Sequence, residues 1–358
     1  MLFEEISYGG LKVKNRLVRS ATLELGTTAD GSLTQEYLEI HKRLADGGVG
    51  TIISGITGIG LEGRVMPQMP SVLHDNFVEM IEKDSDYIHK KGAKLIVQLV
   101  HCGFLAFPTS GNIIVPSKTQ TIQSMSKYSM ETMTKQDISQ IIEQYVCAAV
   151  KCKEAGADGV QIHAAHGFLL SEFLSPFFNK RTDEYGGDII NRTRIVTEII
   201  EGIHKKVEKN FSIWIKINHS DGFEGGISLQ DSIKAAIIFD KLGVDVIEVS
   251  SGITGAPTFL PNKIINCKED EEYNKDAAIQ IAEEMKHASV IAVGGFRSYA
   301  KIEECLQNTK IKGISLSRPL ICEPDLPNKW MDNPKYKVQC ILCNRCFLSN
   351  PLRCANQK

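Results

Sequence analysis

The sequence predicts a (β/α)₈ barrel, and two observations support this fold class. First, one unit recurs along the chain: a helical pattern, a break that contains glycine, and a short apolar run rich in β-branched residues. Second, apolar runs such as TIIS (51–54) and KLIVQL (94–99) lack polar alternation, which is typical of parallel strands buried on both faces. An open doubly wound sheet is the alternative, but no G-x-G-x-x-G follows the first run.

Eight apolar runs supply the barrel strands, each with a helical stretch after it. In chain order the predicted strands are 16–21, 49–54, 94–100, 159–163, 212–218, 244–250, 289–294 and 311–317. Glycine breaks after helical stretches, as at Gly156 and Gly243, are typical of the left-handed residue that ends a helix. The longest inserts, 104–134 and 167–188, are expected to form loops over the barrel mouth. The barrel is expected to occupy 1–333, followed by a cysteine-rich tail at 334–358.

Composition limits the class of protein. The chain has 358 residues, of which 42% are hydrophobic, so a large core is available and disorder over most of the chain is excluded. A net charge of −2 gives no general attraction to nucleic acid or to a membrane surface. The sequence shows neither an apolar run of the ~18 residues that a membrane span needs nor a secretory signal. We therefore expect a cytoplasmic protein that acts on small molecules.

The cysteines fall into two groups. Without a signal peptide, six scattered cysteines are expected to be reduced, buried thiols: Cys102, Cys147, Cys152, Cys267, Cys305 and Cys322. The remaining four are close together in the tail: Cys340, Cys343, Cys346 and Cys354. Four closely spaced thiolates suit a [4Fe–4S] cluster or a structural Zn²⁺, or the tail cysteines are reduced and hold no metal.

The residues where barrel strands end are the candidates for chemistry. Gly294-Gly295 lets the backbone approach an anion, and a helix that begins near Ser298 directs its positive N-terminus the same way. Arg318, at the end of the eighth strand, can bind phosphate with two hydrogen bonds. A tight turn and a surface ion pair are the alternative explanation of these residues. Together they predict a phosphate site.

Two histidines and a lysine form the second candidate group. His163 and His166 can direct two imidazoles into one pocket. Three explanations of this pair are open. The two residues are core histidines, or they are metal ligands, although a third ligand is not evident nearby. In the third explanation they are N–H donors to a substrate oxygen. Lys216, inside the fifth strand, needs an anion beside it because an unpaired buried charge is costly. That anion is either a negatively charged ligand ring or a carboxylate.

Several segments resemble one known family. HAAHGFLLSEFLSPFFNKRTDEYGGDIINRTR (163–194) closely resembles the signature segment of the old yellow enzyme family of NADH:flavin oxidoreductases, which are FMN-dependent (β/α)₈ barrels. Further blocks match in order: VKNRLVRSAT (13–22), QLVHCG (98–103), VGGFRS (293–298) and SLSRPLICEPDLP (315–327). The tail spacing resembles the cluster-binding segment of 2,4-dienoyl-CoA reductase and trimethylamine dehydrogenase, although the gap before Cys354 is shorter. The resemblance thus implies FMN, NAD(P)H and a [4Fe–4S] cluster as cofactors.

The resemblance also implies residue roles. Flavin contacts through the backbone are implied for Ser20, Ala21, Thr22 and Leu23. Gln98 would bond the pyrimidine side of the ring, and Lys216 would lie near flavin N1 and O2. The phosphate would be held by Gly294, Gly295, Ser317 and Arg318. His163 and His166 would bind a substrate carbonyl or nitro oxygen. Two positions depart from the family pattern: Phe168 replaces a proton-donating tyrosine, and Leu23 replaces a small polar or sulfur-containing side chain.

The expected activity is NAD(P)H-dependent reduction of the C=C bond of an α,β-unsaturated carbonyl or similar electron-poor alkene. An amine or N-methyl dehydrogenase that exports electrons through the tail is the first alternative. A non-redox phosphate-binding barrel, with Lys216 as a Schiff-base lysine, is the second. Large relatives carry a further dinucleotide-binding half, which we do not expect here. We therefore expect that NAD(P)H reduces FMN directly, or that an external electron carrier works through the tail. Relatives often form dimers or tetramers, which implies a homo-oligomer.

Overall fold

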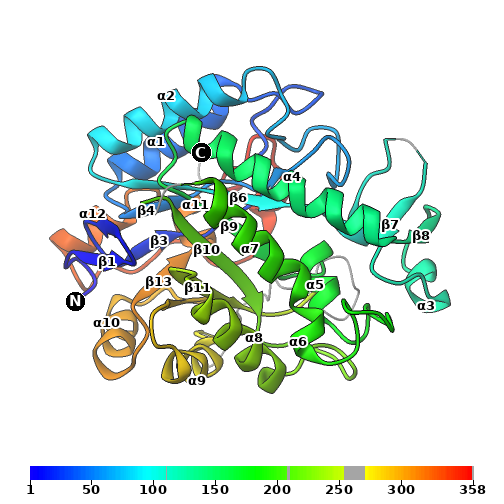
Figure 1. Cartoon of the computed structure of the whole chain (residues 1–358). Helices are drawn as coiled ribbons and strands as arrows, with labels where there is room; N and C mark the ends of the chain where they lie inside the picture. Colours follow the sequence, from blue (N-terminus) through cyan, green and yellow to red (C-terminus); the bar gives the residue numbers. More distant parts are fainter. Residues whose placement is uncertain (110, 208–209, 254–270, 357–358) are drawn as a thin grey trace.

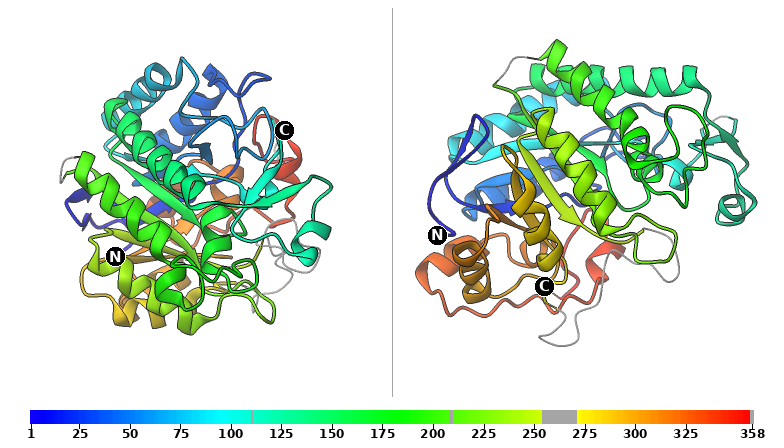
Figure 2. Two further views of the ribbon diagram at one scale, coloured as in Figure 1. Left: turned by 45° about the vertical axis from the view of Figure 1, so that its right-hand side comes forward. Right: turned by 60° about the horizontal axis from the view of Figure 1, so that its bottom comes forward.

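The computed structural model describes residues 1–109, 111–207, 210–253 and 271–356. Its centre is a closed barrel of parallel strands with helices around the outside (Figures 1 and 2). The barrel strands are β3 (Leu17–Arg19), β4 (Thr51–Ile53), β6 (Lys94–Val100), β9 (Gly159–Ala164), β10 (Ser212–Asn218), β11 (Val246–Ser250), β12 (Ser289–Val293) and β13 (Gly313–Leu316). Each pairs with the next, and β13 pairs with β3. The predicted (β/α)₈ barrel is confirmed, and the open doubly wound alternative is wrong.

Amphipathic helices cover the strands. The longer ones are α1 (Gln35–Asp46), α2 (Phe77–Lys90), α4 (Lys135–Glu154), α7 (Arg194–Lys206), α8 (Leu229–Lys241), α9 (Lys275–Glu284) and α10 (Tyr299–Asn308). Shorter helices are α6 (Ile189–Arg192), α11 (Arg318–Cys322) and α12 (Leu326–Asp332). α4 begins with a capping box, in which Thr134 and Asp137 each bond the other's backbone. Gly156 follows α4 with φ of 77°, so the predicted glycine stop is present.

A short hairpin closes the amino end of the barrel. It consists of β1 (Ile6–Tyr8) and β2 (Leu11–Val13), which pair antiparallel. The buried ring of Tyr8 packs edge-on against Trp214 inside the barrel, with centroids 5.4 Å apart. A Cβ on Gly313 would lie 2.2 Å from the Tyr8 hydroxyl, so only glycine fits at the start of β13. The hairpin therefore acts as an apolar plug, which was not predicted from the sequence.

The two long inserts contain more regular structure than predicted. The first holds η1 (Gly103–Leu105), β7 (Ile113–Val115), α3 (Gln120–Ser124) and β8 (Met130–Thr132). β7 and β8 pair in parallel, and with α3 they form an arm that projects from the barrel (Figure 1). The second insert begins with α5 (Leu169–Leu174). Outside both inserts, the short strand β5 (Thr57–Gly58) extends the sheet beside β6. The prediction of plain loops is wrong for both inserts, because buried apolar side chains such as Ile113 and Leu169 anchor them.

The tail packs against the barrel. Glu323 accepts a hydrogen bond of 2.6 Å from the backbone N–H of Gln339, and Leu352 donates one of 2.8 Å to the carbonyl of Glu24. The tail also includes the short η3 (Arg345–Leu348). These contacts hold both ends of the tail onto the first and last barrel units.

The scattered cysteines are mostly buried, as expected. Cys102, Cys152, Cys305 and Cys322 are buried and carry free thiols. Cys147 is exposed on the outer face of α4, so its predicted burial is wrong, and Cys267 lies outside the described residues. In the described ranges, no helix combines the length and the apolar character that crossing a membrane would require.

Candidate functional site

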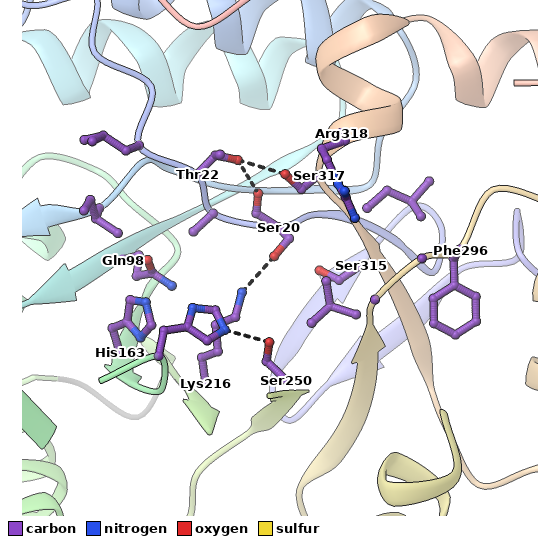
Figure 3. A pocket seen from close by; sticks show the side chains of 18 of the residues that line it. Ser20, Thr22, Gln98, His163, Lys216, Ser250, Phe296, Ser315, Ser317 and Arg318 are labelled. Atoms are coloured by element: carbon purple, nitrogen blue, oxygen red, sulfur yellow. Dashed lines mark hydrogen bonds between the residues drawn. The ribbon is translucent and has the colours of Figure 1, made fainter. Parts of the chain in front are cut away.

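An open cavity of about 260 Å³ lies at the carboxyl end of the barrel strands (Figure 3). Parallel strands of a barrel end on the same side, so residues far apart in the sequence meet here. Every predicted flavin-binding and catalytic residue lines it: Ser20, Ala21, Thr22, Leu23, Gln98, His163, His166, Lys216, Gly294, Gly295, Ser317 and Arg318. In Figure 3, Gln98 and His163 lie together on one side of the cavity, and Arg318 and Phe296 lie on the other. We name these sides the ring end and the phosphate end.

Bare backbone and a buried cation form the phosphate end. Gly294 and Gly295 have φ of 133° and 76°, and a Cβ on Gly294 would lie 2.7 Å from Asn274 Nδ2. Glycine is therefore required, and both glycines line the cavity just before α10 begins. The guanidinium of Arg318 is buried at the start of α11 and donates a 2.7 Å hydrogen bond to Asn344 Oδ1. These groups fit a phosphate dianion.

Lys216 is the central charge of the ring end. Its Nζ donates to Ser20 Oγ at 3.0 Å and lies 3.3 Å from Glu248 Oε2. Lys216 and Glu248 are paired positions on β10 and β11, so the register of the sheet brings them together. Burial alone would raise the pKa of Glu248, but Lys216 and neighbouring hydrogen bonds hold it below its ordinary value. The expected anion beside Lys216 therefore includes a carboxylate of the protein itself.

Gln98 leaves one buried polar atom for a ligand. Its Nε2 donates to Gln161 Oε1 at 2.6 Å, from the paired position on β9. Its Oε1 is buried and has no hydrogen-bond partner among the described residues. An unsatisfied buried acceptor costs free energy, and a ligand N–H in the cavity would remove that cost. The ring end therefore fits a ligand that carries an N–H beside carbonyl oxygens, as the isoalloxazine ring of FMN does.

His163 and His166 stand at the end of β9 as neutral imidazoles. Their rings are 5.3 Å apart at 80°. Burial and nearby positive charge, including Lys216, hold the pKa of each well below its ordinary value. His163 Nδ1 accepts from the N–H of Ala165 at 3.3 Å, which places the ring proton on Nε2. His166 has φ of 63°, and its Nε2 lies 2.7 Å from Ser250 Oγ.

Phe168 and Leu23, the two departures from the family pattern, both line the cavity. The ring of Phe168 packs edge-on against His163, with centroids 4.7 Å apart. Neither side chain offers a proton or a hydrogen bond. The histidine pair therefore works beside an apolar wall.

The tail cysteines surround a smaller cavity next to the first. Cys340, Cys343, Cys346 and Cys354 line it, and Arg318 and Leu342 line both cavities. Cys322, a further buried thiol, packs with Cys340 and Leu342. Within the part of the chain that the structure describes, no three His, Cys, Asp or Glu side chains are placed to hold a single metal ion. The four predicted ligands thus line one cavity.

A (β/α)₈ barrel with two glycines, a buried arginine and a neutral histidine pair at one mouth is the arrangement expected of an enzyme that binds a phosphate-bearing ligand. A model of the "NADH:flavin oxidoreductase / NADH oxidase family" matches residues 1–335, and the chain belongs to this family. It is 32% identical to an NADPH dehydrogenase of Halalkalibacterium halodurans over 92% of this chain and 93% of that one. The resemblance found in the sequence is confirmed, and the chain is an NAD(P)H:flavin oxidoreductase. The non-redox alternative with a Schiff-base lysine is wrong.

Longer proteins are also similar. An NADH oxidase of Thermoanaerobacter brockii is 29% identical over 99% of this chain and 55% of its own length. A solved 2-naphthoyl-CoA reductase complex superposes with a TM-score of 0.90 at 24% identity, covering 99% of this chain and 56% of that chain. This chain therefore spans about half the length of these two proteins. The structural likeness shows a shared fold.

Sequence reasoning missed Glu248, Gln161 and Ser250. Each lies in a strand that was interpreted only as an apolar run or only by its last residues. A charged residue inside VDVIEVS (244–250), expected to be buried on both faces, was the available signal for Glu248.

Proposed function

We propose that the chain holds FMN in the large cavity and reduces the C=C bond of an α,β-unsaturated carbonyl or a similar electron-poor alkene with NAD(P)H. The phosphate end would hold the FMN phosphate through Gly294, Gly295, Ser317 and Arg318. At the ring end, Gln98 and Lys216 would contact the pyrimidine edge, and residues 20–23 would lie along the ring through their backbone. FMN, when bound, supplies the hydride transfer from NAD(P)H to the alkene.

The histidine pair carries the proposal. A neutral His163 with its proton on Nε2 is a hydrogen-bond donor beside the ring end. His166 is fixed by Ser250 and by a 3.2 Å bond from its own N–H to Asn218 Oδ1. If His166 Nε2 accepts from the Ser250 hydroxyl, the proton of the His166 ring is on Nδ1. The two N–H groups, His163 Nε2–H and His166 Nδ1–H, would then bind a substrate carbonyl oxygen and stabilise the negative charge that develops on it. That polarisation makes the β-carbon of an enone electrophilic.

Proton delivery must differ from that in relatives with a tyrosine. Phe168 stands at that position and has no hydroxyl group. We propose that water in the open cavity supplies the proton to the α-carbon. The substrate would then be one in which the anion left after hydride addition, such as an enolate, is basic enough to take a proton from water.

A purified, anaerobic sample tests the activity. A visible flavin spectrum that NADH or NADPH bleaches, and that an enone or enoate restores, supports the proposal. A colourless protein that takes up no flavin on reconstitution contradicts it. Comparison of the two nicotinamides also identifies the reductant.

One observation favours a second candidate, an amine or N-methyl dehydrogenase. Arg318 and Leu342 line both the large cavity and the cysteine cavity, so a redox group at each site would be close together. We propose that the four tail cysteines hold a [4Fe–4S] cluster. A cluster held by these cysteines would supply one-electron transfer between the reduced flavin and an external carrier. Flavin bleaching by N-methyl amines, with no bleaching by NAD(P)H, would select it.

The setting of the protein follows from the same proposal. Substrate and nicotinamide are small molecules, and an electron carrier would be the macromolecular partner. We propose that the protein acts in the cytoplasm, where thiolates stay reduced, and that it forms a homo-oligomer. Fractionation and sedimentation of the native protein test these two points.

A further inference from the structure

Glu248 lies one layer beneath the large cavity and does not line it. Its side chain is fully buried, yet three other polar side chains converge on it. Ser20 Oγ donates to Oε1 at 2.7 Å, Gln161 Nε2 donates to Oε2 at 2.9 Å, and Lys216 Nζ lies 3.3 Å from Oε2. Ser20 and Lys216 themselves line the cavity. A buried carboxylate therefore supports the ring end from below.

The carboxylate fixes the direction of a hydrogen-bond chain. An ionised carboxylate only accepts hydrogen bonds, so the Gln161 group that faces Glu248 must be its NH₂. The Gln161 carbonyl oxygen then faces Gln98, and the Gln98 group in contact with it must also be an NH₂. As a result, the Gln98 carbonyl oxygen is the atom left without a partner in the described structure. The orientation of both amides is thus set by one acceptor at the end of the chain.

The same carboxylate also places the charge. Lys216 is held between Glu248 and Ser20, at the mouth side of β10. The ring end then offers an acceptor, Gln98 Oε1, and a cation, Lys216 Nζ, to whatever ligand lies there. An imide edge, –CO–NH–CO–, carries the complementary groups: an N–H for the acceptor and a carbonyl oxygen for the cation.

We propose that Glu248 is a positioning residue that makes the ring end specific for an imide edge, by directing the Gln161–Gln98 chain and by holding Lys216. This inference rests on the proposed function, because FMN supplies the imide edge. It goes beyond that function in assigning the recognition to a residue that touches neither cofactor nor substrate. Direction and charge are separable, since Gln161 transmits the first and Lys216 the second.

Two variants separate the two effects. Gln161→Met breaks the chain without changing charge. We expect the FMN dissociation constant to rise by up to about tenfold, the value of one hydrogen bond. We also expect the N3–H resonance of ¹⁵N-labelled FMN to move toward that of free flavin, with the reduction potential near that of wild type. Glu248→Gln removes the negative charge beside Lys216. We expect the potential of the bound flavin to become more positive, because the reduced flavin anion then faces an uncompensated cation.

Glu172→Gln is the control for the replacement of a buried carboxyl group by an amide, since Glu172 is also fully buried but lies outside this chain of side chains. Burial raises the pKa of Glu172 well above its ordinary value, so this variant changes no charge. It should change neither the N3–H resonance nor the potential. An unchanged N3–H resonance in Gln161→Met overturns the directional role of Glu248, and an unchanged potential in Glu248→Gln overturns its role through Lys216. If wild type itself binds no FMN, the proposed function fails, and that result is distinct from both. Should Glu248→Gln not fold, Gln161→Met still tests the chain.

Discussion

Arg318 Nη1 donates a 2.7 Å hydrogen bond to Asn344 Oδ1, and so ties the phosphate end of the cavity to the cysteine-rich tail. The same nitrogen lies 3.3 Å from the carbonyl oxygen of Leu342, which lines both cavities. A substitution of Arg318 should therefore affect both the phosphate end and the cysteine-rich tail.

Arg318→Ala should weaken FMN retention by about 2 kcal/mol, or about thirtyfold, because hydrogen bonds from a cation to phosphate are stronger than neutral ones. Dialysis followed by fluorescence of released flavin measures the loss. Asn344→Gly is the control: it removes only the tail partner, and glycine accepts the φ of 64° found at this position. It should loosen the tail and leave most of the flavin bound. Equal flavin loss in both variants would argue that Arg318 serves the tail alone.

His163→Ala combined with His166→Ala should keep FMN but weaken binding of phenolic or carbonyl ligands. Loss of two hydrogen bonds should cost about 2–3 kcal/mol. Charge-transfer absorbance between the flavin and a phenol reports the affinity directly. His204→Ala, on the outer face of α7, is the control because its ring bonds only the Leu242 carbonyl in the described structure. Ligand affinity that the double variant leaves intact would contradict the pocket assignment.

Serine substitution of any one tail cysteine should lower the iron content of anaerobically purified protein from about four per chain, the number in a [4Fe–4S] cluster. FMN should remain bound, because the barrel closes without the tail. Iron analysis together with flavin absorbance gives both values from one sample. Cys147→Ser, at an exposed position on α4, should change neither. Bound zinc, or wild-type protein without iron after anaerobic purification, would refute the cluster.

Stability should depend on pH through His41. Burial alone would lower its pKa, but Asp84 and Glu24, 2.5 Å and 3.0 Å from the two ring nitrogens, raise it to about 10. The ordinary value in the unfolded chain is about 6.5. Because the folded value is the higher one, this contribution is full below about pH 6.5 and is lost as pH rises through about 10. Urea midpoints measured across this range should fall with pH.

His41→Gln should flatten that pH dependence and destabilise the protein by about 3–5 kcal/mol, the usual cost of breaking a buried ion pair. His89→Gln is the comparison, since His89 pairs with Asp158 at a partly exposed site. A urea midpoint that still falls between pH 6.5 and 10 in the His41 variant would assign the effect to another group.

The sequence was sufficient for the barrel and for the residues at its mouth, and the reason is geometric. Once the strands are assigned, closure of the parallel barrel brings their carboxyl ends to the same side. Gln98, Lys216 and Arg318 are therefore expected to line the same mouth. Glu248 could not be predicted in the same way. Its contact with Lys216 depends on the register of β10 and β11, which two apolar runs do not specify.

Other features arise from long-range packing that leaves no periodic pattern. His41 is buried between Glu24 and Asp84, and the three residues come from three different segments of the chain. The tail has no helical or strand pattern, and single contacts such as Leu352 with Glu24 hold it in place. The hairpin at 6–13 is too short to stand out from the first barrel strand.

The hairpin at 6–13 also affects how the substrate and the nicotinamide reach the cavity. In the described structure, Tyr8 and its neighbours fill the amino end, and the cavity lies at the opposite mouth. The hydride donor and the hydride acceptor would then enter by the same mouth and compete for the space beside the ring end. Each should act as a competitive inhibitor of the other at high concentration, and initial-rate plots should give the parallel lines of a double-displacement scheme.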